Sequence, residues 1–486
     1  MTQDILSFDN YYLVGIKGVA MSSLASCLAD VGKNVAGSDV ATDFVTKNVL
    51  DQLGLSHIDD FSTPLPDATD CLIFTSAHQA SANPQVRQAG ERGIAVFSQA
   101  EAMANLANRH QTIAVCGVGG KSTISAMITW ILEKTGHQPS YSVGVGEIVG
   151  LGRNGAYRPG SEHFVVEADE YVTDPVAAQN GRHTPRFSYL EPDLLVVSQI
   201  RFDHPDVYRD LAHTKEVYGE FFAKLPVKAP LIVNGDDATT LELASQAADR
   251  NDLRLITYGS GQDLDWQLGP VKVENQRLQA RVSYQGGELE LSLNLPGTYN
   301  LINGLSAVAT CVELGVEPGE AAEALASFAS TKRRAEYLGQ KNGVDYYDDY
   351  AHHPSEVAAI TGAFLEWLPG RRLVFAFQPH TYSRTKALLN DFVEVLSQVP
   401  ELVILDIFAS AREQLDESIS SAKLVELINQ ARSDGAGDKA WPAAKHLSGL
   451  DELHHFCLNE LEPGDALITL GAGDIYLLGE RLELKP

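Results

Sequence analysis

The sequence predicts an α/β protein of three domains, each built on a mainly parallel sheet. Short apolar runs alternate with helix-like segments along the chain, and several of these runs end in glycine-rich or acidic loops. At 486 residues, the chain is also too long for one ordinary hydrophobic core. We expect domains over residues 1–108, 109–328 and 329–486.

The first domain is predicted from an alternation of strands and helices. YYLVGI (11–16) and NVAGSD (34–39) read as strands on either side of the helix MSSLASCLADVG (21–32). DCLIFTSA (70–77) and IAVFS (94–98) are two further strands. Strands joined through helices predict a doubly wound parallel sheet of the Rossmann type.

The second domain continues the pattern and then changes it. Its predicted parallel strands are 112–117, 163–169, 193–200 and 229–237. Short alternating runs with polar turns over 253–295 indicate a small antiparallel insert, and 300–316 reads as a helix opened by asparagine.

The third domain is predicted to begin near residue 330. VDYYDDYAHHPSE (344–356) opens it, and strands at 372–379, 401–408 and 465–473 follow with intervening helices. This returns to the βα alternation of a second Rossmann-like sheet.

Composition limits the possible functions. The net charge of −27 argues against a general nucleic-acid binder, which needs clustered Lys and Arg, but allows a small anionic substrate in one locally basic cleft. Five scattered cysteines have no metal-ligand spacing. We find neither a secretory signal pattern nor an apolar run of membrane-spanning length, and therefore expect a cytoplasmic protein. We expect a monomer or a weak dimer.

The stretch AVCGVGGKSTISAM (114–127) has the form of a phosphate-binding loop between a strand and a helix. Its glycines are Gly117, Gly119 and Gly120. Glycines let backbone N–H groups turn toward phosphates, Lys121 can reach phosphate oxygens, and the Ser122 hydroxyl suits Mg²⁺. The alternative is a glycine-rich turn with an incidental lysine. Ala114 stands where the common loop pattern begins with glycine.

A second glycine loop, VGIKGVAM (14–21), is followed about 20 residues later by Asp39. This spacing is typical of a Rossmann-like nucleotide site. The signal is weak by itself because Ala20 replaces the third glycine, and a packing role stays open. Lys17, within this loop, is a candidate phosphate contact.

Acidic residues cluster after two central strands. They are Glu167, Asp169 and Glu170 in VVEADE, and Asp203, His204 and Asp206 in IRFDHPD. Such residues project toward the crevice at the carboxyl ends of parallel strands, where oxygen ligands suit Mg²⁺. Helix caps and surface carboxylates are the alternative for either cluster alone.

The third domain carries three further motifs, KRRAEYLG (332–339), DDYAHHP (348–354) and FQPHTYSRT (377–385). The adjacent arginines are candidates for contacting a phosphoryl group. His352 and His353 are compatible with substrate binding, helix capping or a domain junction.

In this order the motifs resemble those of the Mur ligases, ATP-dependent amide-forming enzymes of peptidoglycan synthesis. The resemblance covers the whole chain and includes GTYNLIN (297–303). The phosphate loop of that family begins with alanine, which accounts for Ala114. Within the family, the motifs are most similar to those of enzymes that join L-alanine to UDP-N-acetylmuramate. The resemblance implies a UDP-binding N-terminal domain, a central ATPase domain and a C-terminal domain that helps hold the amino acid.

The resemblance also implies roles for single residues. ATP would be bound by Gly117, Gly119, Gly120, Lys121, Ser122, Thr123, Asn300, Asn303 and Arg334. Mg²⁺ ligands would be Ser122, Glu167 and His204. Substrate would be bound by Gly15, Gly18, Asp39, Ser76, His352 and Arg384. Catalytic roles would fall to Lys121, Glu167, His204, Arg334, His352 and Arg384.

The implied reaction passes through an acyl phosphate, which the amine of the amino acid then attacks. Charge neutralisation by Lys121, Mg²⁺ and Arg334, and closure of the C-terminal domain, would support it. The chain departs from the family pattern at Lys17, Ala20, Val118, Gly119, Tyr299 and Thr381. Thr381 replaces an arginine, so substrate choice or affinity could differ.

Three other interpretations stay open. The first is a recycling ligase that adds a whole tripeptide to the same nucleotide sugar. The second is an inactive nucleotide-sugar-binding protein, against which Lys121, Glu167, His204 and Arg334 count. The third is a dinucleotide-dependent oxidoreductase, which leaves the phosphate loop unexplained.

Overall fold

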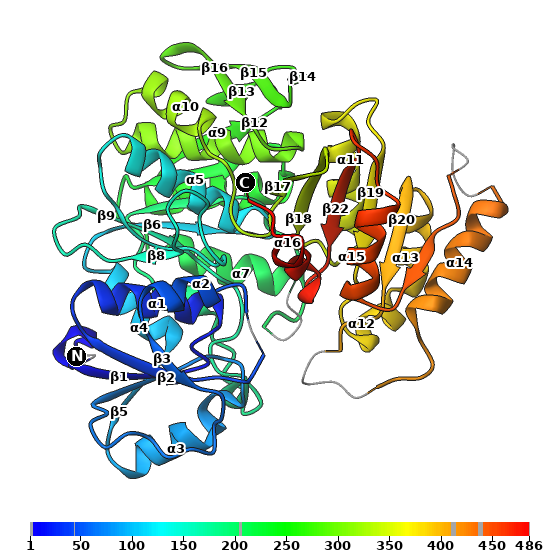
Figure 1. Cartoon of the computed structure of the whole chain (residues 1–486). Helices are drawn as coiled ribbons and strands as arrows, with labels where there is room; N and C mark the ends of the chain where they lie inside the picture. The colour runs from blue at the N-terminus through cyan, green and yellow to red at the C-terminus, as the bar shows by residue number, and fades with distance from the viewer. Residues whose placement is uncertain (1–2, 43, 204–206, 410–414, 436–440, 486) are drawn as a thin grey trace. The chain divides into compact units, whose positions relative to one another are not determined.

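The chain folds into two units in the computed structural model, which describes residues 3–42, 44–203, 207–409, 415–435 and 441–485. The first unit comprises residues 1–272, 279–294 and 299–332. The second comprises residues 273–278, 295–298 and 333–486. Three sheets, mostly parallel, lie between helices (Figure 1), which confirms the predicted α/β fold class.

The first sheet is five-stranded and parallel, in the order β3-β2-β1-β4-β5. Its strands are β1 (Asn10–Val14), β2 (Asn34–Ser38), β3 (Ser56–Ile58), β4 (Cys71–Phe74) and β5 (Ala95–Ser98). Its helices are α1 (Val19–Asp30), α2 (Lys47–Gln52), α3 (Pro84–Glu91) and α4 (Gln99–Ala107), with the short 3₁₀ turns η1 (Ile5–Ser7) and η2 (Ala80–Ala82). The sequence missed β3, whose three residues are exposed and carry no apolar run.

Both faces of this sheet are buried, because successive side chains of a strand point to opposite sides. Tyr11 and Leu13 of β1 pack with α1 and α4, whereas Tyr12 and Val14 pack with α3. The α4 helix begins at a capping box in which Ser98 and Glu101 exchange side-chain and backbone hydrogen bonds.

The second sheet has eleven strands, in the order β14-β15-β13-β12-β11-β10-β6-β9-β7-β8, with β16 paired to β15. Its first strands along the chain are β6 (Gln111–Cys116), β7 (Ser140–Ser142), β8 (Gly155–Ala156), β9 (His163–Glu167), β10 (Leu194–Val197) and β11 (Pro230–Asn234). The later strands are β12 (Arg254–Gly259), β13 (Trp266–Leu268), β14 (Lys272–Glu274), β15 (Arg277–Tyr284) and β16 (Gly287–Leu293). The central strand β6 lies parallel between β9 and β10.

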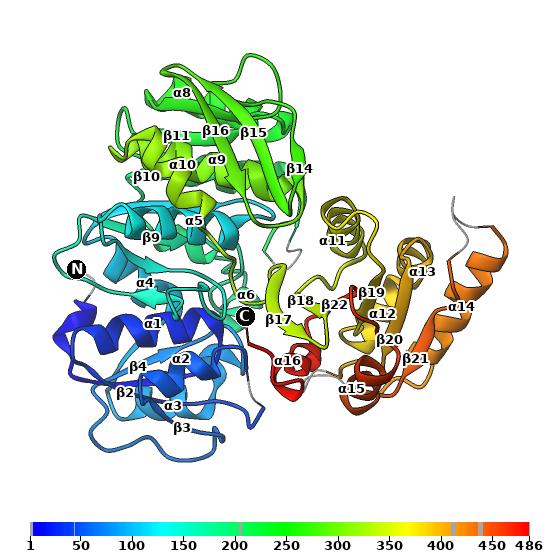
Figure 2. The same cartoon turned by 45° about the horizontal axis from the view of Figure 1, so that its top comes forward.

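Helices cover both faces of the second sheet (Figure 2). They are α5 (Lys121–Lys134), α6 (Pro175–Ala178), α7 (Leu211–Phe222), α8 (Ala238–Asn251), α9 (Thr298–Glu313) and α10 (Pro318–Ala326), with the 3₁₀ turn η3 (Arg186–Tyr189). The α5 helix packs against α10, where the Trp130 indole N–H donates to the Ala324 carbonyl at 3.0 Å. The residues of α7 and α8 instead join the core that contains α1 and α4.

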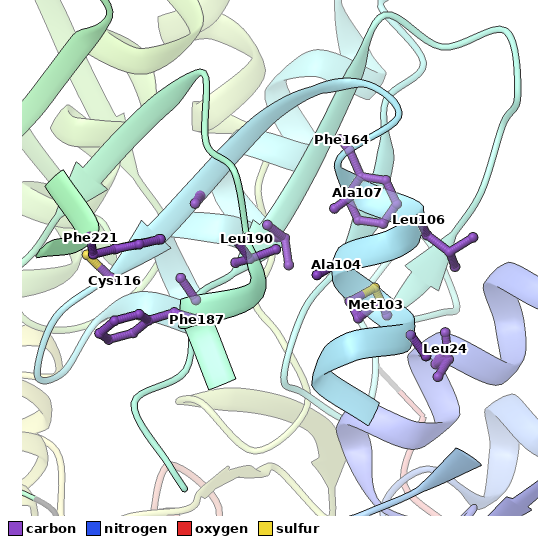
Figure 3. Packing of buried hydrophobic residues seen from close by; sticks show 14 of the residues in the cluster. Leu24, Met103, Ala104, Leu106, Ala107, Cys116, Phe164, Phe187, Leu190 and Phe221 are labelled. Carbon is purple, nitrogen blue, oxygen red and sulfur yellow. The ribbon is translucent and has the colours of Figure 1, made fainter. Parts of the chain in front are cut away.

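One continuous apolar core joins the first sheet to the second. Figure 3 shows Leu24, Met103 and Phe164 toward one end of this cluster and Phe187 and Phe221 toward the other. The helix α1 also approaches β8 closely: a Cβ on Gly155 would lie 2.4 Å from the Ser23 carbonyl oxygen. The N-terminal sheet is therefore held by direct backbone packing as well as by the shared core.

Two local predictions in this region were wrong in detail. The antiparallel insert was predicted to start at 253, yet β12 and β13 continue the sheet in parallel, and antiparallel pairing starts between β13 and β15. The reason is that β12 follows the crossover helix α8, which returns the chain in the parallel direction. The helix α9 begins at Thr298, so Asn300 lies in its first turn and does not open it.

The third sheet lies in the second unit, in the order β17-β18-β22-β19-β20-β21. Its strands are β17 (Glu336–Lys341), β18 (Val344–Asp349), β19 (Leu373–Phe377), β20 (Glu401–Leu405), β21 (Lys445–Leu447) and β22 (Ala466–Leu470), of which only the β17–β18 pair is antiparallel. Its helices are α11 (Pro354–Trp367), α12 (Tyr382–Ala387), α13 (Leu389–Ser397), α14 (Ser421–Ser433), α15 (Leu450–Asn459) and α16 (Leu478–Arg481), with η4 (Asp474–Leu477). Separate apolar clusters fill its two faces.

Two carboxylates at the end of β18 anchor the arginine-rich segment that precedes β17. Asp348 accepts a hydrogen bond from the buried Arg333 guanidinium at 2.9 Å, and Arg333 also donates to the carbonyls of Gly471 and Gly473. Asp349 accepts from the backbone N–H groups of Ala335 and Ala351, each at 2.8 Å. Burial raises the pKa of Asp349 to about 6, against the opposing effect of Arg334.

All five cysteines are buried and carry free thiols. Within the ranges that the structure describes, no helix combines the length and the apolar character needed to cross a membrane.

Gly155→Ala is expected to lower the free energy of unfolding by about 1–3 kcal/mol, because its Cβ would enter the contact between β8 and α1. Gly160→Ala is the matched control, since no atom lies within 4 Å of a Cβ at that position. Chemical denaturation of the two variants checks this. Equal losses in both variants would contradict the proposed close packing.

Asp349→Asn is expected to remove a pH dependence of stability. With a pKa of about 6 in the folded state against an ordinary 3.8, the native carboxyl binds more protons than the unfolded one across this window. The wild type therefore loses stability as pH rises from 4 to 6, whereas the variant does not. The difference in unfolding free energy, variant minus wild type, should rise by up to about 3 kcal/mol between pH 4 and 7. Denaturation curves at a series of pH values measure it, and a flat difference would contradict the assignment.

Candidate nucleotide-binding site

The loop between β6 and α5 depends on glycines at two close approaches. Gly117 has φ +110, and a Cβ there would lie 2.5 Å from the Ser198 hydroxyl oxygen. Gly120 has φ +79, and a Cβ there would lie 2.8 Å from Oδ1 of Asn303. Side chains are thus excluded at both positions by backbone conformation and by space. The fold itself therefore favours glycine at two of the three predicted loop positions, Gly117 and Gly120.

The end of β10 fixes the path of this loop. The Val118 N–H donates to the Gln199 carbonyl at 2.8 Å, and the Ser198 hydroxyl donates to the Gly119 carbonyl at 2.6 Å. Neither contact uses the side chain at 118 or 119, so the backbone alone fixes this part of the loop.

A buried carboxylate lies inside the loop. Glu170, whose side chain is 1% exposed, accepts from the Lys121 ammonium at 2.5 Å, the Gly117 N–H at 3.1 Å and the Tyr218 hydroxyl at 2.6 Å. Burial alone would lower the pKa of Lys121, but the carboxylates of Glu170, Asp169 and Glu167 outweigh it and raise the pKa. Lys121 is therefore a fully charged ammonium at neutral pH.

A second carboxylate, Glu167, lies beside the first turn of α5. It accepts from the Ser122 hydroxyl at 3.0 Å and from the Gly144 N–H at 2.8 Å. A Cβ on Gly144 would lie 2.7 Å from this carboxylate, so a side chain there would force the carboxylate to shift. Burial raises the pKa of Glu167, and Lys121 opposes that rise. The adjacent oxygens of Ser122 and Glu167 are the donor types that Mg²⁺ prefers, so the residues fit this ion.

The remaining predicted nucleotide residues of the first unit lie around the same loop or outside the described ranges. Thr123 follows in the first turn of α5, and the Asn303 side chain adjoins Gly120. Asn300, one turn earlier in α9, is buried. His204 falls outside the described residues, as does Asp206. Among the residues that are described, no group of three or more His, Cys, Asp or Glu side chains is arranged as a metal site.

The N-terminal loop places Gly15, Gly18 and Asp39 together. Gly15 has φ +86, and the Gly18 N–H donates to its carbonyl at 3.1 Å. The buried Asp39 carboxylate accepts from the N–H groups of Lys17 and Val40, each at 2.8 Å. The Asp39 carboxylate therefore holds the backbone at Lys17, within the loop, and at Val40. The spacing of the loop and Asp39 in the sequence did not predict this structural role.

The Lys17 side chain points into the protein. Its ammonium donates to the carbonyls of Val40 and Thr42 and to the Asp59 carboxylate, at 2.8, 3.3 and 2.7 Å. These three contacts use the three N–H donors of the ammonium. The structure thus gives Lys17 a structural role in place of the phosphate contact considered from the sequence.

Sequence reasoning missed Arg186. Its guanidinium donates to the Asp169 carboxylate at 2.8 Å and also to the Ser76 hydroxyl. Arg186 thereby connects the acidic motif after β9 to Ser76, the predicted substrate residue after β4. A solitary arginine in HTPRFSY carried no pattern that could have indicated this, since the contact spans 110 residues.

The predicted site residues of the second unit form their own cluster. Arg384 on α12 lies with its Nη1 3.1 Å from Nδ1 of His380, and the ring centres of His380 and His352 are 6.2 Å apart. Burial lowers the pKa of His352, which favours the neutral imidazole. Arg334 is exposed, with its guanidinium 5.6 Å from the centre of the Tyr350 ring.

The two adjacent arginines have different environments. Arg333 is buried and bound by Asp348 and two carbonyls, whereas Arg334 projects to the surface. Of the pair that the sequence offered for a phosphoryl group, Arg333 is therefore a structural residue.

Thr381 is the N-cap residue that precedes α12, with φ +67 and ψ 142. A β-branched residue in this region of backbone conformation is strained, and such strain concentrates where a loop must hold one shape. Its N–H donates to the Phe408 carbonyl at 3.0 Å, which holds the segment leading to Arg384.

Family models match nearly the whole chain. The Mur ligase family catalytic domain matches residues 10–111, the Mur ligase middle domain matches 115–311, and the glutamate ligase domain of Mur ligases matches 333–473.

A UDP-N-acetylmuramate–L-alanine ligase of Desulfitobacterium hafniense (strain Y51) is 33% identical over 97% of this chain and 98% of its own length. The structure is similar to the crystal structure of UDP-N-acetylmuramate-alanine ligase MurC from Thermotoga maritima, with a TM-score of 0.78, 23% identity and 98% of both chains covered. The structure of a murein peptide ligase from Psychrobacter arcticus gives a TM-score of 0.66 at 20% identity, again over 98% of both chains. From the sequence matches over this length, we conclude that the chain belongs to the Mur ligase family.

Proposed function

We propose that the protein joins L-alanine to the carboxylate of UDP-N-acetylmuramate, with conversion of ATP to ADP and phosphate, as a cytoplasmic step of peptidoglycan precursor synthesis. Mur ligases are ATP-dependent ligases, and the D. hafniense relative with this activity in its name aligns end to end. The proposed substrates are small molecules, and the proposal includes neither nucleic acid nor insertion into a membrane.

One observation carries the proposal most directly. The Gly117 N–H and the Lys121 ammonium already hold a carboxylate, so the loop is formed as an anion-binding site. The amino terminus of α5 adds to the positive potential at this place. We assign these donors to the phosphates of ATP, together with Gly119, Gly120 and Thr123.

Mg²⁺ is part of the proposal, with Ser122 and Glu167 as its protein ligands and His204 as the ligand of a further ion. When bound, Mg²⁺ would neutralise phosphate charge during phosphoryl transfer. The Gly144 N–H fixes one Glu167 oxygen, so the other, 3.0 Å from the Ser122 hydroxyl, is held in place for such an ion. Asn300 and Asn303 are assigned to the adenine end of the nucleotide.

The chemistry divides into two steps. A carboxylate is a poor acylating agent, so its oxygen first attacks the γ-phosphorus of ATP, ADP leaves, and an acyl phosphate forms. The amine of alanine then attacks the acyl carbon, phosphate leaves, and the amine gives up a proton. Lys121 and Arg334 are assigned to the charge that develops on the transferred phosphoryl group.

Residues of the second unit are assigned to the amino acid. Arg384 offers a bidentate donor for a carboxylate. His352, whose pKa is lowered by burial, is neutral and can accept a hydrogen bond from the attacking amine. On the nucleotide-sugar side, we assign Gly15, Gly18, Asp39 and Ser76.

Lys121→Ala is expected to reduce ADP release by at least about 100-fold, since it removes the charge nearest the transferred group. Lys134→Ala is the matched control at the other end of α5, where the ammonium lies 4.4 Å from the Trp130 ring centre. A coupled assay of ADP release with UDP-N-acetylmuramate and L-alanine measures both. Equal activity in the two variants would contradict the role of the loop.

A panel of amine substrates tests the substrate assignment. With UDP-N-acetylmuramate present, L-alanine is expected to support ADP release, and glycine to do so with a kcat/KM lower by about tenfold or more, because it lacks one methyl group. L-Serine and a tripeptide complete the panel. Turnover with the tripeptide alone would show the recycling ligase, and nucleotide-sugar binding without any turnover would show an inactive binder.

A further inference from the structure

The carboxylate of Glu170 occupies the position in the loop where an anion is expected. We propose that Glu170 is an internal competitor for the phosphate groups of the nucleotide: it holds the loop in its nucleotide-free form and is displaced when phosphate binds. This inference rests on the proposed use of ATP, and it concerns a residue for which that proposal has no role.

The contacts of Glu170 are those that a phosphate would make. One oxygen accepts from the Gly117 N–H and the Tyr218 hydroxyl, at 3.1 and 2.6 Å, and the other accepts from Lys121 at 2.5 Å. Two of these donors, Gly117 and Lys121, belong to the loop itself. A carboxylate and a phosphate share negative charge and acceptor oxygens, so the same donors serve both.

The two anions compete for the same donors. Glu170 is buried, and the Lys121 side chain is only 14% exposed, so water screens the two groups poorly. A phosphate that arrived with Glu170 in place would face a like charge within a few ångströms and would find Lys121 already paired. We therefore expect phosphate binding to weaken or displace the contact between Glu170 and Lys121.

Glu167 and Asp169 do not share this arrangement. Glu167 is held by Ser122 and Gly144, and Asp169 is paired with Arg186. Of the three carboxylates in EADE, Glu170 is the one that bonds to both Lys121 and the Gly117 N–H. Asp169 is therefore a suitable control. It carries the same charge close to the loop, but its partner is Arg186, whereas Lys121 and the Gly117 N–H bond to Glu170.

The test is the affinity for ADP and for inorganic pyrophosphate, measured by titration calorimetry without amino acid or nucleotide sugar. Glu170→Gln keeps the size of the side chain and removes its charge, so both dissociation constants should fall at least about fivefold. Tyr218→Phe removes one donor that holds Glu170 and should shift them in the same direction by a smaller factor. Asp169→Asn should change them by less than Glu170→Gln.

Three results would overturn the inference. Weaker binding by Glu170→Gln would mean that Glu170 orients Lys121 for the nucleotide, and unchanged binding in both Glu170→Gln and Tyr218→Phe would mean a purely structural role. An equal gain in Asp169→Asn would indicate a general field effect in place of direct competition. Should Glu170→Gln fail to fold, the dissociation constants of Tyr218→Phe test the inference. Tighter binding than in the wild type supports it, and unchanged or weaker binding overturns it. Absence of ADP binding by the wild type would instead contradict the proposed function.

Discussion

A buried lysine must have a partner, and much of the central site follows from this constraint. Leaving the Lys121 ammonium unpaired in a poorly hydrated loop would cost several kcal/mol. Glu170 removes this cost in the nucleotide-free protein, and Tyr218 satisfies a further lone pair of the carboxylate. The Lys121 ammonium therefore has a carboxylate from the same chain as its partner in the loop. This requirement links Tyr218 on α7 to a loop almost 100 residues earlier in the chain.

The parallel sheet gathers these groups because strands that run the same way end at the same edge. The loop follows β6, the EADE carboxylates lie at or just after the end of β9, and Ser198 follows β10. The strands β9 and β10 are the two neighbours of β6. The close approaches at Gly117 and Gly144 then bring backbone N–H groups within reach of the carboxylates. Strand order thus places the groups at one edge of the sheet, and the absence of side chains at Gly117 and Gly144 leaves room for their contacts.

The sequence was sufficient for the α/β class, the family and the enzyme type, because apolar periodicity and the spacing of motifs are local properties. It could not show which of Glu167, Asp169 and Glu170 pairs with Lys121, since the orientation of each carboxylate is set only where β9 ends. Nor could it find Arg186 or Tyr218, which act through contacts 110 and 48 residues away. Lys17 shows the opposite error: a lysine in a glycine loop suggests a phosphate ligand, but Asp59 and two carbonyls take its donors. The assigned roles of the site residues stay predictions.

Backbone groups, not side chains, fix the phosphate-binding loop at Val118 and Gly119. Here the Val118 N–H and the Gly119 carbonyl are bound by Gln199 and Ser198 of the neighbouring strand end, and side-chain identity does not enter these contacts. Position 119 has room for a side chain, but its φ of +79 favours glycine. Hydrogen bonds to the neighbouring strand end therefore fix the loop, and the Gly117 N–H and the Lys121 ammonium both donate to the Glu170 carboxylate.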